Sequence, residues 1–192
     1  MTAPTTAAVE RFERLYQESS DPWGYRTSEY EREKYAATLA ALPKRSYGLC
    51  LEVGCSIGVF TGRLATRCQH VVAIDFSLSA LQLAGHHLQG VPNVDLLRAD
   101  FPEETPPGSW DLVVCSEILY YLQPPQFEQA VGWIKTQLGY GASVLAASWR
   151  GVGREEPLLG DAVHDRLAQE LAGWHVLDAR QDGYRLDRFD GK

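Results

Sequence analysis

The sequence predicts an α/β fold built on a mainly parallel sheet of seven strands. Short apolar runs alternate along the chain with longer stretches of helical composition. The first apolar run leads into a glycine-rich turn of the kind that joins a strand to a helix in such sheets. Two further apolar runs near the end of the chain are expected to form a closing pair of strands.

The elements follow from these patterns in chain order. Residues 9–42 are predicted to be mostly helical, with an interruption at Asp21-Pro22-Trp23-Gly24. Five strands are then expected in the parallel part of the sheet, at residues 49–53, 71–74, 94–97, 110–115 and 143–149. Helical stretches are expected between them, at residues 59–68, 77–87, 117–122 and 124–138. The closing strands are expected at residues 174–179 and 184–189.

Local signals support several of these boundaries. Ser77 or Ser79 is the expected N-terminal cap of the helix at residues 77–87, because a serine oxygen can accept from the free N–H groups of a first helical turn. Pro124-Pro125 marks the start of a helix, where the missing N–H of proline does no harm. Gly139-Tyr140-Gly141 marks a turn before the fifth strand.

Length and composition bound the class of protein. The 192 residues suit one compact domain, and 45% hydrophobic with 22% charged residues is typical of a soluble protein with a real core. The four cysteines, at positions 50, 55, 68 and 115, match no zinc or disulfide framework, so no metal site is expected.

Net charge, the length of the apolar runs and the N-terminal residues indicate which classes of partner and which cellular compartment to expect. A net charge of −7 and a pI of about 5.2 argue against a nucleic-acid partner bound through its phosphates. No apolar run approaches the roughly 18 residues of a membrane span, so no membrane partner is expected. The first eight residues lack the basic and apolar segments of a signal peptide, and the expected compartment is the cytoplasm.

The turn after the first strand carries the main functional signal. It reads Glu52-Val53-Gly54-Cys55-Ser56-Ile57-Gly58. A dinucleotide fingerprint would place glycines at positions 54, 56 and 59, whereas this chain has Ser56 and Val59 at the last two. The acid before the first glycine suits a cofactor with cationic ammonium and sulfonium groups rather than a pyrophosphate. Electrostatics therefore favours S-adenosylmethionine.

At this point the sequence resembles the class I S-adenosylmethionine-dependent methyltransferases over roughly residues 45 to 150. The usual form of their first motif has glycine where this chain has Ser56. The resemblance implies a Rossmann-like sandwich with helices on both faces of the sheet. It also implies that Asp75, 21 residues after Gly54, binds the ribose hydroxyls. Asp100 would accept from the adenine amino group beside Phe101, and Ser116-Glu117 would line the cofactor and acceptor side.

The resemblance is closer still to the nodulation-type NodS N-methyltransferases. It extends to Asp21-Pro22-Trp23-Gly24-Tyr25, to Tyr30-Glu31-x-x-Lys34-Tyr35, and to Ser116-Glu-Ile-Leu-Tyr-Tyr121. Those enzymes methylate the free amine of a deacetylated chitooligosaccharide, which implies an amino sugar, an oligosaccharide or another small amine as the acceptor. The implied organisation is a single domain with an N-terminal helical lid at 9–44, a cofactor-binding core at 45–150 and an acceptor-side segment at 151–192.

The candidate site residues have alternative structural roles. Asp75 and Asp100 are also typical of a helix cap and of a turn, and Glu117 of an acid that complements a helix dipole. The aromatic residues around Trp23 form either a lid, with Arg32 or Lys34 reaching the cofactor carboxylate, or a packing stripe. Tyr120 and Tyr121 are either core residues or part of the acceptor pocket. Glu117 is the first candidate for the base and His164 the second, although a lone histidine is more often a surface or capping residue. The cofactor-binding candidates are Trp23, Tyr30, Arg32, Glu52, Gly54, Cys55, Ser56, Gly58, Asp75, Phe76, Asp100, Phe101, Ser116 and Glu117.

The leading hypothesis is a small-molecule N-methyltransferase, and three others stay open. The acceptor group is a hydroxyl of a sugar or natural product in the second hypothesis. The third is a nicotinamide-dependent reductase, against which the missing glycine at position 59 counts. The fourth is a regulator that binds S-adenosylmethionine without turnover. Methylation of nucleic acid is disfavoured, because Ser116-Glu117-Ile118-Leu119 lacks the Asn/Asp-Pro-Pro-aromatic pattern that such enzymes often carry.

Overall fold

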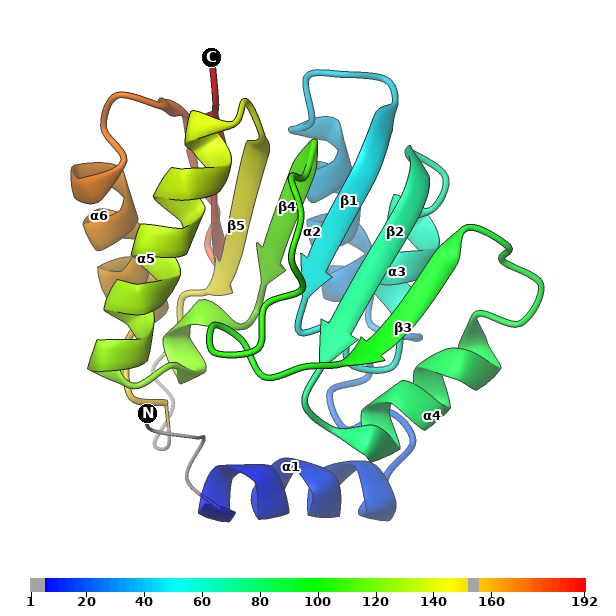
Figure 1. Cartoon of the computed structure of the whole chain (residues 1–192). Coiled ribbons are helices and arrows are strands. Elements are labelled where there is room, and N and C mark those ends of the chain that lie inside the picture. Colours follow the sequence, from blue (N-terminus) through cyan, green and yellow to red (C-terminus); the bar gives the residue numbers. More distant parts are fainter. Residues whose placement is uncertain (1–5, 152–155) are drawn as a thin grey trace. The chain divides into compact units, whose positions relative to one another are not determined.

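Strands and helices alternate along most of the chain (Figure 1). The computed structural model describes residues 6–151 and 156–192, and seven strands lie within these ranges. The chain forms two compact units, which meet in sequence between Pro106 and Pro107. The predicted strands are all present, and their mainly parallel arrangement is confirmed by the pairings described below.

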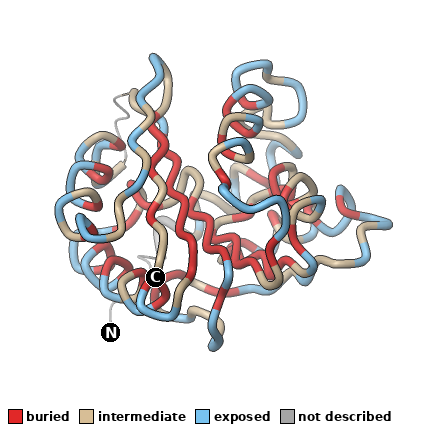
Figure 2. The backbone as a smooth tube through the Cα atoms, turned by 90° about the horizontal axis from the view of Figure 1, so that it is seen from above, coloured by how far each residue is buried: buried red, intermediate tan, exposed pale blue. Residues whose placement is uncertain are grey.

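The first unit holds three parallel strands and the N-terminal helices. Cys50 of β1 pairs with Val71 of β2, and Val71 pairs in turn with Val94 of β3. Most residues of β1 and β2 are buried (Figure 2), as expected for parallel strands covered on both faces, whereas β3 has no buried residue. The elements of this unit are α1 (Thr6–Glu18), α2 (Glu29–Ala40), β1 (Tyr47–Val53), α3 (Val59–Leu64), β2 (Cys68–Asp75), α4 (Leu78–His87) and β3 (Val94–Arg98).

The second unit adds one parallel pair and an antiparallel end. Leu112 of β4 pairs with Ser143 of β5 in parallel, whereas Ser143 pairs with Asp190 of β7 in an antiparallel ladder. Strands β6 and β7 are also antiparallel, which confirms the closing pair. The elements are β4 (Leu112–Ser116), the 3₁₀ helix η1 (Leu119–Tyr121), α5 (Pro124–Gly139), β5 (Ser143–Trp149), α6 (Gly160–Glu170), β6 (His175–Arg180) and β7 (Tyr184–Asp190).

Helix starts follow the predicted capping chemistry. Of the two candidate caps, Ser77 is the one used, since its hydroxyl accepts from the backbone N–H of Ala80 at 3.1 Å. Helix α5 begins at Pro124, as predicted, and a capping box joins Gln123 and Gln126 in front of it.

Three helical predictions need correction. Helix α3 ends at Leu64 instead of reaching residue 68, because Cys68 already pairs with Tyr47 as the first residue of β2. The stretch 117–122 forms only one 3₁₀ turn, at Leu119–Tyr121. Helix α6 was not predicted, although its apolar residues Val163 and Leu167 recur four positions apart and are buried. The division into lid, core and acceptor-side segments stays a prediction.

Candidate functional site

The loop after β1 is held in a tight left-handed conformation. Gly54, Ser56 and Gly58 have φ angles of +74°, +50° and +80°. The backbone N–H groups of Gly54 and Cys55 both donate to the carbonyl of Ile74, at 2.8 and 3.0 Å, which attaches the loop to β2. Glycine adopts such angles without steric cost, whereas a serine is strained by them. The loop therefore needs the two glycines of the motif, and Ser56 requires a separate explanation.

Gly58 is also constrained by its neighbours. A Cβ atom at this position would lie 2.9 Å from Leu88 Cδ1 and 3.1 Å from Ala84 Cβ of α4. Gly58→Ala is expected to destabilise the protein by roughly 1–3 kcal/mol, because overpacking adds to the backbone strain. Urea unfolding measures the change.

Gly90→Ala is the matched control for this substitution. Gly90 has a similar φ of +83°, but a Cβ atom there would meet nothing within 4 Å. An equal loss in the two variants would show that backbone strain alone accounts for the effect and that helix α4 does not constrain the loop.

Two buried carboxyl groups lie at the ends of the strands that flank this loop. Glu52 of β1 is 3% exposed, and its Oε2 has no hydrogen-bond partner among the described residues. Burial, with the charge of Asp75 adding to it, raises the pKa of Glu52 to about 8. Burial also raises the pKa of Asp75 to about 6, although hydrogen bonds from the backbone oppose the rise.

Asp75 is tied to the loop and to the next helix at the same time. Its Oδ2 accepts from the N–H of Ser56 and its Oδ1 from the N–H of Ser77, both at 2.9 Å. Each carboxylate oxygen keeps a further lone pair for a ligand. The helix-cap alternative and the ribose-binding role are therefore compatible in this geometry.

This arrangement fits a cationic cofactor. The ionised form of a buried carboxyl group is costly, and a cation bound beside it offsets this cost. An ammonium beside Glu52 would stabilise its ionised form, whereas a pyrophosphate would repel it. The residues present thus suit the ammonium and sulfonium of S-adenosylmethionine, with Asp75 suited to ribose hydroxyls.

The segment after β3 supplies the next candidates. Ala99 N–H donates to the carbonyl of Asp75 at 3.1 Å, so the ends of β2 and β3 are joined. Asp100 is partly buried, and burial followed by the charges of Glu103 and Glu104 raises the pKa of Asp100 to about 6. Phe101 is buried beside it. Their roles toward an adenine ring stay predictions.

The N-terminal aromatic residues pack onto the loop. Trp23 stacks on Tyr25 with ring centroids 5.6 Å apart, and meets Tyr16 edge-on at 5.5 Å. This cluster includes Ile57 of the loop. The packing stripe is therefore present, whether or not the same segment also acts as a lid.

The other candidates of this segment differ in exposure. Tyr30 and Arg32 are exposed, and Arg32 pairs with Glu29 at 2.7 Å. Lys34 is buried and paired with Glu31 at 2.9 Å. Phe76 meets Phe12 edge-on at 5.5 Å. Cys55 is buried like the other three free cysteines, and burial raises the pKa of its thiol.

Two residues of α1 at this site were missed by the sequence reasoning. Tyr16 donates its hydroxyl to Ser56 Oγ at 2.7 Å, and Glu13 Oε1 accepts from the N–H of Leu78 at 2.8 Å. The four-residue spacing of Phe12 and Tyr16 was a signal for a packed helix face. Nothing in the sequence indicated a polar partner 40 residues away.

In the second unit, Glu117 directly follows β4 and has a φ of +59°. Its backbone N–H donates to the carbonyl of Ala147 at 2.8 Å. Its Oε2 accepts from the Tyr120 hydroxyl at 2.6 Å and from the N–H of Trp149 at 2.9 Å. Non-glycine residues in this conformation cluster at functional sites. Ser116 is the last residue of β4, directly before Glu117.

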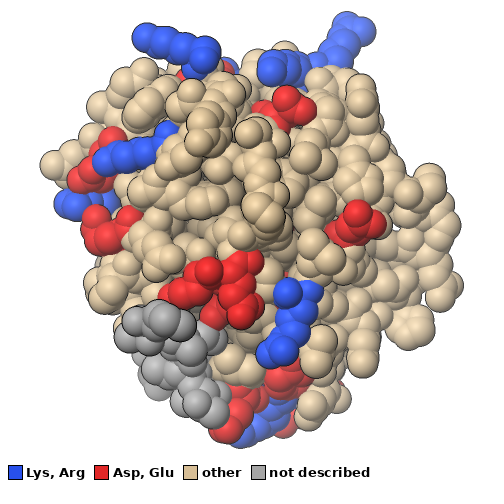
Figure 3. All heavy atoms as spheres, in the orientation of Figure 1, with Lys and Arg blue, Asp and Glu red and all other residues tan. Residues whose placement is uncertain are grey.

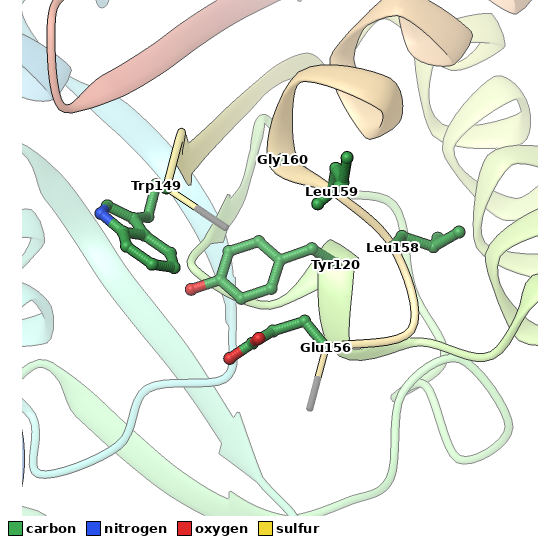
Figure 4. Close-up of a pocket in the computed structure, with 7 residues that line it drawn as sticks. Tyr120, Trp149, Glu156, Leu158, Leu159 and Gly160 are labelled. Carbon is green, nitrogen blue, oxygen red and sulfur yellow. The ribbon is translucent and has the colours of Figure 1, made fainter. Parts of the chain in front are cut away.

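A pocket open to solvent lies beside Tyr120 and Trp149, and its empty space of about 180 Å³ includes some of that solvent. Trp149 is 39% exposed at the end of an otherwise buried strand. Figure 4 shows the rings of Trp149 and Tyr120 with the carboxylate of Glu156 around the cavity. Tyr120 therefore lines a pocket, and its role toward an acceptor stays a prediction. The lining residues are Tyr120, Trp149, Gly151, Glu156, Leu158, Leu159 and Gly160.

His164 lies in a buried charged cluster of α6, β6 and β7. It is 0% exposed, and its Nδ1 is hydrogen-bonded to Asp187 Oδ2. Asp187 also contacts His175 Nε2 at 2.7 Å and Arg185 Nε at 3.2 Å. Tyr120, which donates to Glu117, lines a pocket, whereas the imidazole of His164 is fully buried. Glu117 is therefore the stronger candidate for the general base.

Among residues 6–151 and 156–192, no group of three or more His, Cys, Asp or Glu side chains is arranged to hold a metal ion. None of the described helices is long and apolar enough to cross a membrane. Acidic and basic side chains are both scattered over the face drawn in Figure 3.

Comparisons with known proteins identify relatives. The family model of nodulation protein S (NodS) matches residues 5–138. Nodulation protein S of Rhizobium tropici is 29% identical over 134 residues, which cover 69% of this chain and 56% of that protein. Phosphoethanolamine N-methyltransferase 1 of Arabidopsis thaliana is 31% identical over a stretch that covers 57% of this chain and 24% of the Arabidopsis protein. This chain spans about half the length of the NodS relatives it matches.

A solved structure shows the same fold. The N-methyltransferase NodS from Bradyrhizobium japonicum, in complex with S-adenosylhomocysteine, matches with a TM-score of 0.79 and 21% identity. The match covers 95% of this chain and 97% of that one. The expected Rossmann-like methyltransferase fold is thereby confirmed.

Proposed function

The chain belongs to the nodulation protein S (NodS) family, and we propose that it is an S-adenosylmethionine-dependent methyltransferase that methylates an amine of a small-molecule acceptor. The preferred acceptor is an amino sugar or a deacetylated chitooligosaccharide. The observation that carries the proposal is the buried carboxyl group of Glu52 beside the left-handed loop, because its Oε2 has no hydrogen-bond partner among the described residues and its ionised form is stabilised by a cation. The similarity to nodulation protein S of Rhizobium tropici and to a phosphoethanolamine N-methyltransferase supports an amine as the group that is methylated.

The residues of the first unit hold the cofactor in this proposal. Glu52 stabilises the ammonium, Asp75 accepts from the ribose hydroxyls, and Asp100 with Phe101 receives the adenine. S-adenosylmethionine supplies a methyl group on a sulfonium, which an uncharged nucleophile displaces directly. Ordering the reacting groups in near-attack geometry can contribute roughly 7–11 kcal/mol to such a reaction.

The residues of the second unit handle the acceptor and its proton. An ammonium has no lone pair to attack with, so the amine must lose a proton first. An amine in the cavity passes this proton to the Tyr120 oxygen, while the Tyr120 hydroxyl passes its own proton to Glu117 across the 2.6 Å hydrogen bond. Trp149 and Glu156 are placed to contact the rest of the acceptor.

A screen of acceptors tests the proposal. The protein is incubated with S-adenosylmethionine and with glucosamine, deacetylated chitooligosaccharides or phosphoethanolamine, and formation of S-adenosylhomocysteine is measured. The matched N-acetylated sugars keep the hydroxyls and lack the free amine. Turnover of the amines alone supports N-methylation, whereas equal turnover of the acetylated sugars would favour the O-methyltransferase. Binding of NADH without S-adenosylmethionine would favour the reductase.

Glu117→Gln is expected to lower kcat/KM for the amine about 100-fold, because general-base assistance of this kind typically contributes that much or more. Affinity for S-adenosylhomocysteine is expected to stay unchanged. Steady-state kinetics and calorimetry measure the two quantities. Glu128→Gln on α5 is the control, since Glu128 is an exposed partner of Arg166. Full kcat/KM in Glu117→Gln would remove Glu117 from this role.

A further inference from the structure

Ser56 occupies a position where a side chain is unfavourable. Its φ of +50° places it in the left-handed region, which costs a non-glycine residue roughly 1–2 kcal/mol. Glycine would avoid this cost, and the related motif usually has glycine here. A serine at this position therefore calls for a contact that offsets the strain.

The hydroxyl of Tyr16 provides that contact. It donates to Ser56 Oγ at 2.7 Å from helix α1. The backbone N–H of the same serine donates to Asp75 Oδ2 at 2.9 Å. Ser56 thus connects α1, through its side chain, with the carboxylate at the end of β2, through its backbone.

Helix α1 has a second attachment to the same region. Glu13, one turn before Tyr16, accepts from the N–H of Leu78 at 2.8 Å. The adjacent N–H, that of Ser77, donates to Asp75 Oδ1 at 2.9 Å. The buried side chain of Tyr16 packs in one cluster with Ile57 of the loop and Ala80 of α4. One carboxylate oxygen of Asp75 therefore accepts from a residue that α1 contacts, and the other accepts from the neighbour of such a residue.

We propose that Tyr16 is a positioning residue for the cofactor, acting through Ser56, and that α1 and the loop open and close together. Binding at the loop then protects α1 from opening, and loss of the Tyr16 hydroxyl weakens binding by the same coupling, because linkage is reciprocal. The nature of the ligand rests on the proposed function. The coupling between α1 and the loop does not.

A double-mutant cycle tests the coupling, with S-adenosylhomocysteine as the probe. Tyr16→Phe keeps the ring and removes the donor, and Ser56→Ala removes the acceptor. Each variant is expected to weaken binding about fivefold, the value of one neutral hydrogen bond. The double variant is expected to lose the same fivefold rather than about 25-fold. Additive losses would show that the two residues act independently and would overturn the proposal.

Hydrogen exchange supplies a readout that needs no ligand. Amides of residues 54–58 and of α1 are expected to exchange faster in Tyr16→Phe than in the parent protein. Tyr140→Phe is the control, because Tyr140 is exposed at the end of α5. Unchanged exchange of the loop would overturn the coupling. Faster exchange in a protein that fails to bind S-adenosylhomocysteine would support the coupling and reject the proposed cofactor.

Ser56→Gly separates positioning from stability. The glycine relieves the backbone strain and removes the hydroxyl, so the thermal midpoint is expected to hold or rise while affinity for S-adenosylhomocysteine falls. A purely structural role for Ser56 would move both quantities in the same direction. Parent-like affinity in Ser56→Gly would show that the serine is only tolerated at this position.

Discussion

Glu52→Gln is expected to stabilise the ligand-free protein above pH 8 and to weaken cofactor binding at the same time. Burial raises the pKa of Glu52 from 4.5 to about 8, so the folded state binds the proton more tightly than the unfolded state does. The stability associated with the protonated group is fully present below pH 4.5 and is lost as the pH rises to about 8. At about 1.4 kcal/mol per pKa unit, the loss is of the order of 5 kcal/mol. Glutamine stays neutral at every pH, so the Glu52→Gln variant does not lose this stability.

Urea unfolding at pH 5 and pH 9 measures this effect. The parent protein is expected to lose more stability between the two values than Glu52→Gln does. Glu33→Gln on α2 is the control, because Glu33 is exposed. Equal losses in the parent protein and in Glu52→Gln would contradict the assignment of the pH dependence to Glu52.

The same carboxyl group predicts proton release when the cofactor binds. A cation beside Glu52 favours its ionised form, so binding near pH 7 is expected to expel a proton from the parent protein. Calorimetry in two buffers with different ionisation enthalpies counts the protons released. The count is expected to fall in Glu52→Gln, together with the affinity.

Asp75→Ala is expected to weaken binding of S-adenosylhomocysteine by 100-fold or more. The variant loses charge-assisted hydrogen bonds to the ribose, which are worth about 1.5–3 kcal/mol each. It also leaves the N–H groups of Ser56 and Ser77 without their acceptor. Because burial raises the pKa of Asp75 to about 6, affinity in the parent protein is expected to fall as the pH drops through this value.

Isothermal titration across pH 5 to 8 checks both parts of this prediction. Asp95→Ala on β3 is the control, since Asp95 is an exposed partner of His70. An Asp75→Ala variant with parent-like affinity would exclude Asp75 from the cofactor site. A parent protein whose affinity is flat across this range would exclude its titration from the binding step.

The fold was predictable because β1, β2, β4 and β5 each contain a short apolar run and the turns carry strong local signals. Ser77 was one of two predicted caps, and the bounds of β5 match the prediction. The end of α3 was wrong because helical composition continues past Leu64, while pairing of Cys68 with Tyr47 takes over. Such competition between local propensity and strand pairing cannot be read from a short window of sequence.

The candidate site was predictable where its residues follow one another along the chain. The loop from Glu52 to Gly58 was predicted from its spacing, and the role of Asp75 was implied by the resemblance to the class I methyltransferases. The contact of Tyr16 with Ser56 joins residues 40 positions apart, so no local pattern announces it. Similarly, the sequence gave no sign that His164 would contact Asp187 in the core or that Arg185 would pair with the same Asp187. Polar partners brought together by tertiary packing were the part that the sequence did not predict.

The buried charges of β7 have a consequence for how the chain finds its native pairing. Arg185 and Asp187 lie two positions apart and point to the same side of the strand, where Asp178 of β6 contacts Arg185 and His164 of α6 contacts Asp187. A slip of one residue would turn Leu186 to their place and bury both charges without partners, at a cost of several kcal/mol. Apolar strands tolerate such slips far better. The cluster therefore discriminates against misaligned hairpins during folding, and replacing it by leucines would risk a more stable protein with several competing arrangements of its last strand.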